Sequence, residues 1–101
     1  METCERSLAG RWALILGASS GFGAATACAL AREGMHIFGV HLDPRRSLPR
    51  AEAVMAAIEA SGSRAVFFNV NAADAQKRAR VVAAMADTLA ADHQEAVHLL
   101  V

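Results

Sequence analysis

The sequence lacks the features that mark several classes of protein. Its 101 residues include no tyrosine, two prolines and two cysteines, and ten basic residues balance ten acidic ones. Because the basic residues are scattered, the chain has no charged patch for nucleic acid or an anionic membrane. No apolar run approaches the roughly 20 residues of a membrane span, and residues 1–6 do not resemble a secretory signal. We therefore expect a cytoplasmic protein with no nucleic-acid or membrane partner.

The cysteines and histidines predict neither a disulfide nor a metal site. Cys4 and Cys28 lack C-x-x-C spacing, so we expect two free thiols in a reducing compartment. No carboxylate or thiol lies at metal-ligand spacing from any of the four histidines, which are His36, His41, His93 and His98. A hydrophobic content of 54% without a flexible linker predicts a single globular domain over residues 1–101.

What the sequence does contain is a glycine-rich turn, residues 17–23, between an apolar segment and an alanine-rich segment. Gly17 allows a sharp turn after a strand. Gly21 allows the backbone to approach a pyrophosphate, and Gly23 allows close packing of the following helix, whose N–H groups would face the anion. The order of strand, glycine-rich turn and helix predicts a phosphate-binding turn. The alternative is a glycine-rich turn that binds no ligand. Ser19 and Ser20 would donate to the phosphate or stabilise the turn.

Strand-like and helix-like segments alternate along the chain. We expect strands at residues 12–16, 36–41, 64–69 and 96–101, and helices at residues 22–33, 47–61 and 74–91. Apolar residues at helical spacing predict two buried stripes, one of Ala51, Val54, Met55 and Ile58 and one of Val81, Val82, Met85 and Leu89. Asn71 and Asp74 resemble a capping pair before the last helix. The alternation predicts an α/β fold with a parallel sheet and right-handed crossovers.

The glycine spacing G-x-x-x-G-x-G, followed by Ala-Thr-Ala-Cys-Ala-Leu-Ala-Arg-Glu-Gly, resembles the N-terminal half of the short-chain dehydrogenase/reductase family. The resemblance extends from Leu8 to Val101. It departs at Leu16, where threonine is usual, and at Phe22, where a smaller isoleucine or leucine is usual. It implies a Rossmann-like, partial doubly wound sheet of four strands in the order 3-2-1-4 with three helices. The first two helices would cover one face and the third the other.

The resemblance also implies that the chain binds a nicotinamide dinucleotide for hydride transfer to or from a carbonyl or alcohol. The implied cofactor-binding residues lie in the glycine-rich turn and at the ends of the second and third strands: Gly17, Ser19, Ser20, Gly21, Phe22, Gly23, His41, Asp43, Arg45, Arg46, Asn69 and Val70. Asn69, where the family usually has aspartate, could accept from the adenine amino group while the Val70 N–H meets a ring nitrogen. Alternatively, Asn69 satisfies the loop backbone at the strand end.

The choice between NAD and NADP depends on the end of the second strand. The family's NAD-type aspartate falls at position 41, where this chain has His41, and Asp43 follows two residues later. A carboxylate there would accept from the ribose 2′-hydroxyl of NAD, whereas Arg45 or Arg46 would attract the 2′-phosphate of NADP. The arginines could equally be solvated loop charges. We expect NADP or NAD, with a slight preference for NADP.

The residues that perform the family's proton chemistry are missing. The family uses a Ser…Tyr-x-x-x-Lys arrangement beyond the fourth strand, but this chain has no tyrosine, and its one lysine, Lys77, is expected on a solvated helix face. We therefore expect a C-terminally truncated fragment of an oxidoreductase. A free-standing nucleotide-binding or interaction module is the alternative, while the glycine spacing disfavours epimerase-like and methyltransferase-like enzymes. The apolar edge at residues 96–101 predicts a homo-oligomer or a complementary C-terminal segment as partner.

We predict that the isolated chain neither oxidises nor reduces any alcohol or carbonyl. No tyrosine or suitably placed lysine is available to exchange a proton with the substrate oxygen. In a pure preparation, the change in nicotinamide absorbance should stay at the rate of the buffer. Turnover above that rate, retained through successive purification steps, would contradict the prediction.

Overall fold

The computed structural model describes residues 8–101, so the expectation of a free thiol at Cys4 lies outside the described residues. The strands are β1 (Trp12–Leu16), β2 (His36–His41), β3 (Ala65–Asn69) and β4 (Leu99–Leu100), and the helices are α2 (Gly21–Arg32), α3 (Leu48–Ala60) and α4 (Ala75–Ala91). A 3-10 turn, Arg45–Ser47, precedes α3. The predicted alternation is confirmed, and every bound except the start of β4 lies within one residue of the expected position.

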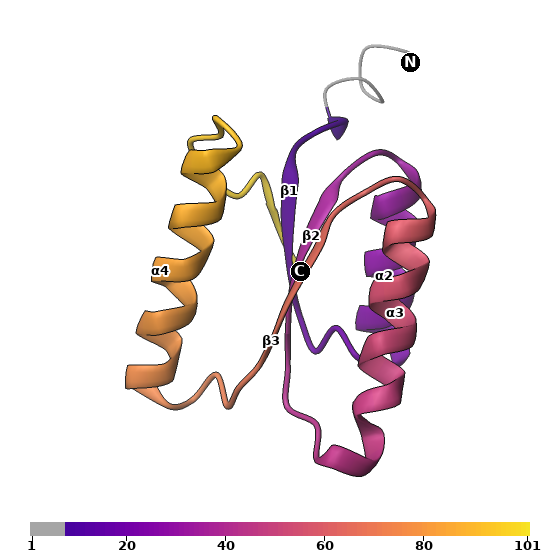
Figure 1. Ribbon diagram of the computed structural model, residues 1–101, viewed down its shortest axis with the longest axis vertical. Helices are drawn as coiled ribbons and strands as arrows, with labels where there is room; N and C mark the ends of the chain where they lie inside the picture. The colour runs from indigo at the N-terminus through magenta and orange to yellow at the C-terminus, as the bar shows by residue number, and fades with distance from the viewer. Residues whose placement is uncertain (1–7) are drawn as a thin grey trace.

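The four strands form one parallel sheet in the order β3-β2-β1-β4, as the resemblance implied. In Figure 1, α2 and α3 lie together on one side of the sheet and α4 lies on the other. Such layers follow from right-handed crossovers between parallel strands. The register pairs Leu16 with Val40 and His41 with Asn69, so the carboxyl ends of β1, β2 and β3 lie next to one another at the same end of the sheet.

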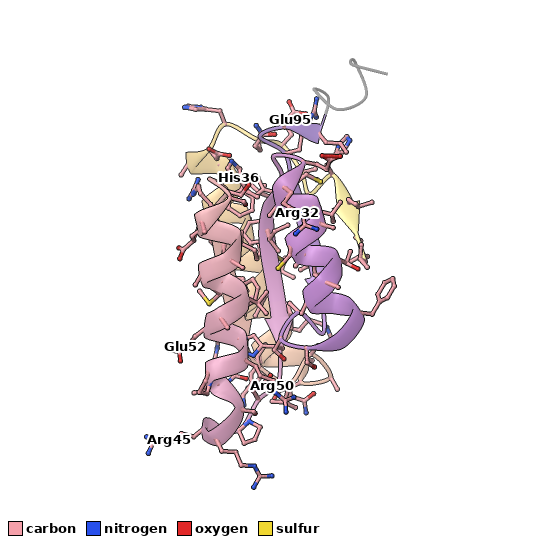
Figure 2. All side chains as sticks on the ribbon, turned by 90° about the vertical axis from the view of Figure 1, so that its right-hand side faces the viewer. Arg32, His36, Arg45, Arg50, Glu52 and Glu95 are labelled. Atoms are coloured by element: carbon pink, nitrogen blue, oxygen red, sulfur yellow. The ribbon has the colours of Figure 1, made fainter. Side chains whose placement is uncertain are left out.

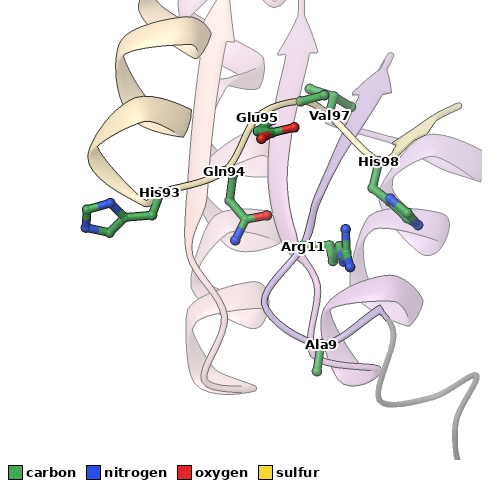
Figure 3. Close-up of a pocket in the computed structure, with 8 residues that line it drawn as sticks. Ala9, Arg11, His93, Gln94, Glu95, Val97 and His98 are labelled. Atoms are coloured by element: carbon green, nitrogen blue, oxygen red, sulfur yellow. The ribbon is translucent and has the colours of Figure 1, made fainter.

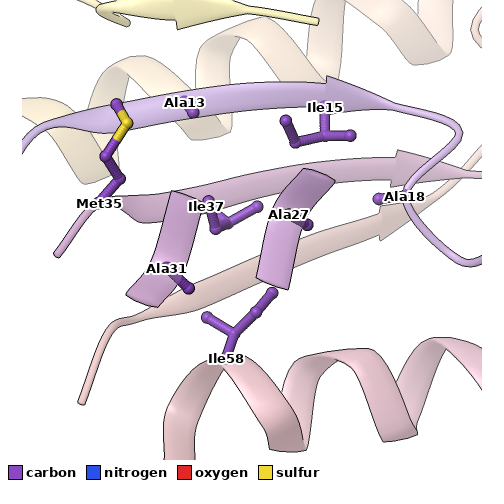
Figure 4. Close-up of a cluster of buried hydrophobic side chains, with 8 residues drawn as sticks. All are labelled: Ala13, Ile15, Ala18, Ala27, Ala31, Met35, Ile37 and Ile58. Carbon is purple, nitrogen blue, oxygen red and sulfur yellow. The ribbon is translucent and has the colours of Figure 1, made fainter. Parts of the chain in front are cut away.

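The face covered by α2 and α3 has a closely packed core (Figure 4). Two alanines of α2, Ala27 and Ala31, are buried against it, and their small side chains let the helix approach the sheet. From α3, Ala51 and Ile58 are buried and Val54 and Met55 are half-buried, as the periodicity predicted. The buried cluster consists of Ala13, Ile15, Ala18, Ala27, Ala31, Met35, Ile37 and Ile58. This dense layer fixes where α2 begins relative to β1.

The opposite face is built around Trp12, which is fully buried and stacks on Phe38 with ring centroids 4.2 Å apart. Helix α4 contributes a row of buried side chains at four-residue spacing: Val81, Met85 and Leu89. Val82, expected in the same stripe, is 55% exposed. The prediction was wrong for Val82 because neighbouring helix positions point about 100° apart, and only the row through Met85 faces the sheet.

The fourth strand is shorter than predicted. The strand comprises Leu99 and Leu100, opposite Ala13 and Leu14, and Val101 after it exchanges backbone hydrogen bonds with Leu14 and Leu16 at 2.9 and 3.0 Å. The partner strand itself begins at Trp12, whose carbonyl oxygen accepts the His98 N–H at 2.8 Å. Residues 96 and 97 therefore lie before the start of the strand with which they were expected to pair.

The start of α4 also differs from the expected capping pair. Asp74 is itself the N-cap, and its Oδ1 accepts the N–H groups of Gln76 and Lys77 at 3.0 and 3.1 Å. Asn71 instead accepts the Ala73 N–H at 2.9 Å, which closes a local turn. An aspartate one residue before a helix satisfies orphan N–H groups directly, so no second residue is required.

Among residues 8–101, none of the helices combines the length and apolar content that crossing a membrane would require.

Polar contacts around Trp12 tie the amino ends of the strands to the end of α4. Trp12 Nε1 donates to Asp92 Oδ2 at 2.9 Å, and Arg64 Nη1 lies 3.5 Å from the other carboxylate oxygen. His36 Nδ1 accepts the backbone N–H of Arg64 at 2.9 Å. Burial lowers the pKa of His36, with Arg64 acting in the same direction and Asp92 opposing both. The cluster therefore accommodates the neutral imidazole.

We predict that the domain loses stability as the pH falls below about 6.5, the ordinary histidine pKa. The folded-state pKa of His36 is lowered, so the unfolded chain binds a proton first, and stability present above the unfolded pKa is lost as the pH falls toward the folded one. His36→Asn keeps an acceptor but does not titrate. Its unfolding free energy in urea should fall less than that of the original chain between about pH 7.5 and about pH 5.5. Equal losses in both proteins would show that His36 does not cause the pH dependence.

Candidate functional site

In the glycine-rich turn between β1 and α2 the chain reverses direction, and its backbone lies close to that of neighbouring segments. Gly17 adopts φ +76°, and its N–H donates to the Val40 carbonyl at 2.8 Å, as the Ala18 N–H does at 3.2 Å. A Cβ on Gly23 would overlap the Gly17 carbonyl oxygen and lie 2.8 Å from its carbon. Only glycine fits at position 23, because the first turn of α2 lies directly against the end of β1.

The beginning of α2, next to the glycine-rich turn, has no side-chain cap. Its N-cap is Ser20, an exposed residue with extended backbone, whose side chain makes no capping hydrogen bond. The first N–H groups of a helix have no intrahelical acceptor, and in α4 such groups are satisfied by Asp74. A Cβ at Gly17 or Gly21 would meet nothing within 4 Å, so space lies beside the turn at both positions.

A hydrogen-bonded carboxylate lies beside the turn. Ser19 Oγ donates to Asp43 Oδ1 at 2.6 Å, and His41 Nδ1 lies 3.1 Å from the same oxygen. The hydrogen bond from Ser19, aided by His41 and Ser47 against partial desolvation, lowers the pKa of Asp43. Asp43 is therefore ionised at neutral pH, and because a carboxylate only accepts, His41 Nδ1 is the donor. The Asp43 side chain is 9% exposed.

The residues expected to bind adenine have partners within the protein. Asn69 Oδ1 accepts the Asp43 N–H at 2.8 Å, and Asn69 Nδ2 donates to the Asp43 carbonyl oxygen at 3.0 Å. The Val70 N–H donates to the His41 carbonyl oxygen at 2.9 Å. These contacts correspond to the alternative role of Asn69, that of satisfying the loop backbone. A contact of Asn69 or Val70 with adenine stays a prediction.

The remaining expected residues lie at the surface. Arg45 and Arg46 are exposed on the 3-10 turn, and Figure 2 shows Arg45 extending away from the start of α3. Phe22, in the first turn of α2, is 81% exposed. Its larger side chain therefore does not disturb the packing of α2 on β1, because it points into solvent.

Two hollows lie at opposite ends of the strands. One of about 240 Å³ lies at the carboxyl ends, beside the glycine-rich turn, and is lined by Leu16, Gly17, Val40, His41, Leu42, Val70, Asn71, Ala72 and Ala73. A larger one of about 520 Å³ lies at the amino ends, where Arg11, His93 and His98 line it (Figure 3). The larger hollow includes none of the expected site residues. Ligands of open parallel sheets bind beyond the carboxyl ends of the strands, which favours the smaller hollow.

The geometry at the carboxyl ends fits a dinucleotide. The turn leaves space at two glycines, the start of α2 has no side-chain cap, and an apolar hollow adjoins the turn at Gly17. Free N–H groups at a helix start bind phosphate oxygens, and an ionised carboxylate at the end of β2 can accept from ribose hydroxyls. Within residues 8–101, no group of three potential metal ligands comes together, and Cys28 is an unbonded, half-buried thiol on α2.

The sequence matches the short chain dehydrogenase family over residues 11–101. The chain therefore belongs to this family, and the resemblance inferred from the glycine spacing is confirmed. No curated protein matches the chain.

Solved structures of the family share the fold. A Sinorhizobium meliloti protein described as a proposed short-chain alcohol dehydrogenase is 32% identical, with a TM-score of 0.73 over 92% of this chain and 33% of its own. A Mycobacterium paratuberculosis short chain dehydrogenase bound to NAD is 29% identical, with a TM-score of 0.74 over 92% and 36%. L-Sorbose reductase from Gluconobacter frateurii, complexed with NADPH and L-sorbose, is 29% identical, with a TM-score of 0.70 over 80% and 30%. The chain thus spans about a third of these proteins.

The sequence did not predict the Ser19–Asp43 hydrogen bond, nor that Asp43 is the loop residue whose backbone forms two hydrogen bonds with Asn69. A signal for both was present. Ser19 and Asp43 follow parallel strands and Asn69 ends one, and the carboxyl ends of such strands meet at one end of the sheet. Which polar groups pair there depends on loop geometry, which periodicity does not describe.

We predict that Gly23→Ala destabilises the domain more than Gly21→Ala. The first substitution forces a Cβ into the Gly17 carbonyl, which should cost at least about 1–3 kcal/mol because backbone must move. The second adds a Cβ in open space at φ +58°, where the left-handed conformation costs about 1–2 kcal/mol. Urea unfolding of both variants measures the difference. A smaller loss for Gly23→Ala would show that the turn relaxes without the close approach.

Proposed function

We propose that this chain is the dinucleotide-binding part of an oxidoreductase, and that it is inactive alone. The observation that supports the proposal most directly is the uncapped start of α2 beside the open glycine-rich turn. When bound, the nicotinamide ring would supply hydride transfer to or from a carbonyl or alcohol. The N–H groups at the start of α2 would bind the pyrophosphate, with Ser19, Ser20 and Phe22 around it. A nucleotide-binding module without catalysis is the alternative, and it uses the same site.

The proposal includes a preference for one dinucleotide. The preference for NADP drawn from the sequence rested on Arg45 and Arg46, which are exposed on the turn after β2. The charged group against the glycine-rich turn is instead the Asp43 carboxylate, through Ser19. A carboxylate accepts from a 2′-hydroxyl and repels a 2′-phosphate, so this arrangement supports NAD. The solved relatives include complexes with NAD and with NADPH. The affinities of this chain for NAD and for NADP therefore test the preference directly.

A complementary polypeptide segment is the partner that we propose for the uncovered edge. β4 pairs with β1 on one side, and Leu100 is 64% exposed. Beside it, an apolar hollow of about 340 Å³ lies between the sheet and α4, where Leu14, Leu16 and Val82 contribute to its lining. Parallel sheets are normally covered on both faces and continue beyond such a strand. The solved relatives are about three times longer than this chain, so a segment equivalent to their remainder would fit here.

We predict that NAD stabilises the chain and that Gly21→Val abolishes this effect. At about 100 times its Kd, a ligand that binds only the folded state adds about 2.7 kcal/mol to the unfolding free energy. Valine at position 21 would fill the space beside the turn that the pyrophosphate needs. The rise in Tm with NAD, measured by calorimetry, should be lost in this variant.

Gly62→Val is the matched control. Gly62 also has positive φ (+92°) and open space around it, but it lies after α3, before the amino end of β3. The control should share the backbone strain and keep the Tm rise with NAD. A rise retained in Gly21→Val, or lost equally in both variants, would contradict the assignment of the site.

A further inference from the structure

The Asn69 side chain is bonded to both polar groups of the Asp43 main chain. Its Oδ1 accepts the Asp43 N–H at 2.8 Å, and its Nδ2 donates to the Asp43 carbonyl oxygen at 3.0 Å. The two bonds hold the backbone on both sides of the Asp43 Cα. The carboxylate of Asp43 is held separately by Ser19 and His41. Asp43 is therefore fixed from the glycine-rich turn and from the end of β3.

An amide is chemically required at position 69 for this arrangement. A carboxylate of the same shape could still accept the Asp43 N–H, but its second oxygen would face the Asp43 carbonyl oxygen with no proton between them. The pair would then be repulsive instead of bonded. Asn69 is also exposed, so its side chain is not retained to fill the core, and its two bonds to Asp43 are its visible role.

We propose that Asn69 is a positioning residue that acts through Asp43 and thereby sets the preference between a ribose 2′-hydroxyl and a 2′-phosphate. The proposal rests on the proposed dinucleotide function. Asn69 fixes the backbone of the loop after β2, the loop fixes the Asp43 carboxylate, and the carboxylate selects the ligand by accepting a hydroxyl and repelling a phosphate. Without Asn69, the Asp43 carboxylate keeps its contacts with Ser19, His41 and Ser47, but the Asp43 main chain loses both bonds to the end of β3.

A direct contact of Asn69 with adenine predicts a different result. NAD and NADP contain the same adenine, so the loss of a contact with the base weakens both by the same factor. The loss of Asp43 positioning weakens NAD and relieves the repulsion of NADP, so it changes the ratio of their Kd values. The ratio therefore separates the two roles, which a measurement of NAD binding alone does not.

The test uses Asn69→Ala and Asn69→Leu, which remove both bonds to Asp43 without adding a charge, in the full chain, with Kd values for NAD and NADP from calorimetry. We expect the preference for NAD over NADP to fall by about fivefold in each variant, the size of one net hydrogen bond. Thr88→Ala is the control, since it also removes a side-chain hydrogen bond to a backbone group, from Thr88 Oγ1 to the Ala84 carbonyl oxygen, but Thr88 lies on α4 and does not line the hollow beside the glycine-rich turn. It should leave the ratio unchanged. Equal weakening of both dinucleotides by the Asn69 substitutions, or a change of ratio in Thr88→Ala, would overturn the proposal.

A ligand-free measurement separates this inference from the proposed function. Hydrogen exchange of the Asp43 amide, followed by nuclear magnetic resonance, should accelerate in Asn69→Ala and stay unchanged in Thr88→Ala. Unchanged exchange in Asn69→Ala would overturn the positioning role even if NAD binds. Accelerated exchange in a chain that binds neither dinucleotide would support the role of Asn69 in fixing the Asp43 main chain. The same result would refute the dinucleotide function and the specificity role that depends on it.

Discussion

The close approach of Gly23 to the carbonyl of Gly17 is the constraint on which the site depends. It brings the first turn of α2 directly against the end of β1, with no room for a Cβ between them. The buried alanines of α2 extend the same contact along the sheet. The N-cap residue Ser20 provides no side-chain capping oxygen to the first N–H groups of this helix. The start of α2 therefore stays open beside the turn, where an anion is a suitable partner.

A second set of contacts joins the loops that follow three parallel strands. Ser19 follows β1, Asp43 follows β2, and Asn69 ends β3, and hydrogen bonds connect them in that order. The β2 end is held on both sides, although the loop itself is at the surface. This arrangement turns Asp43 into a fixed charge beside the glycine-rich turn, which is the property that a specificity-determining carboxylate needs. Its lowered pKa follows chiefly from the hydrogen bond of Ser19.

The two faces of the sheet are unequally covered. Two helices and a dense alanine-rich core close one face, whereas α4 alone covers the other and leaves an apolar hollow beside the β4 edge. The polar cluster of Trp12, Arg64 and Asp92 anchors the end of α4 at the amino ends of the strands. At the carboxyl ends, Leu16 and Leu100 remain exposed. An exposed apolar edge next to a proposed cofactor site is consistent with a chain that spans about a third of its solved relatives.

The order and bounds of the helices and longer strands could be predicted from the amino-acid sequence, because alternating apolar segments and glycine positions are local signals. The glycine spacing also determined the family, and with it the strand order. It did not determine that Val82 is half exposed at the apolar hollow beside α4, because helical spacing alone leaves the edge of an apolar stripe undefined. The length of β4 depended on where its partner β1 begins. The hydrogen bonds between Asp43 and Asn69 could not be predicted in this way, since residues 26 positions apart meet once β2 and β3 align in register.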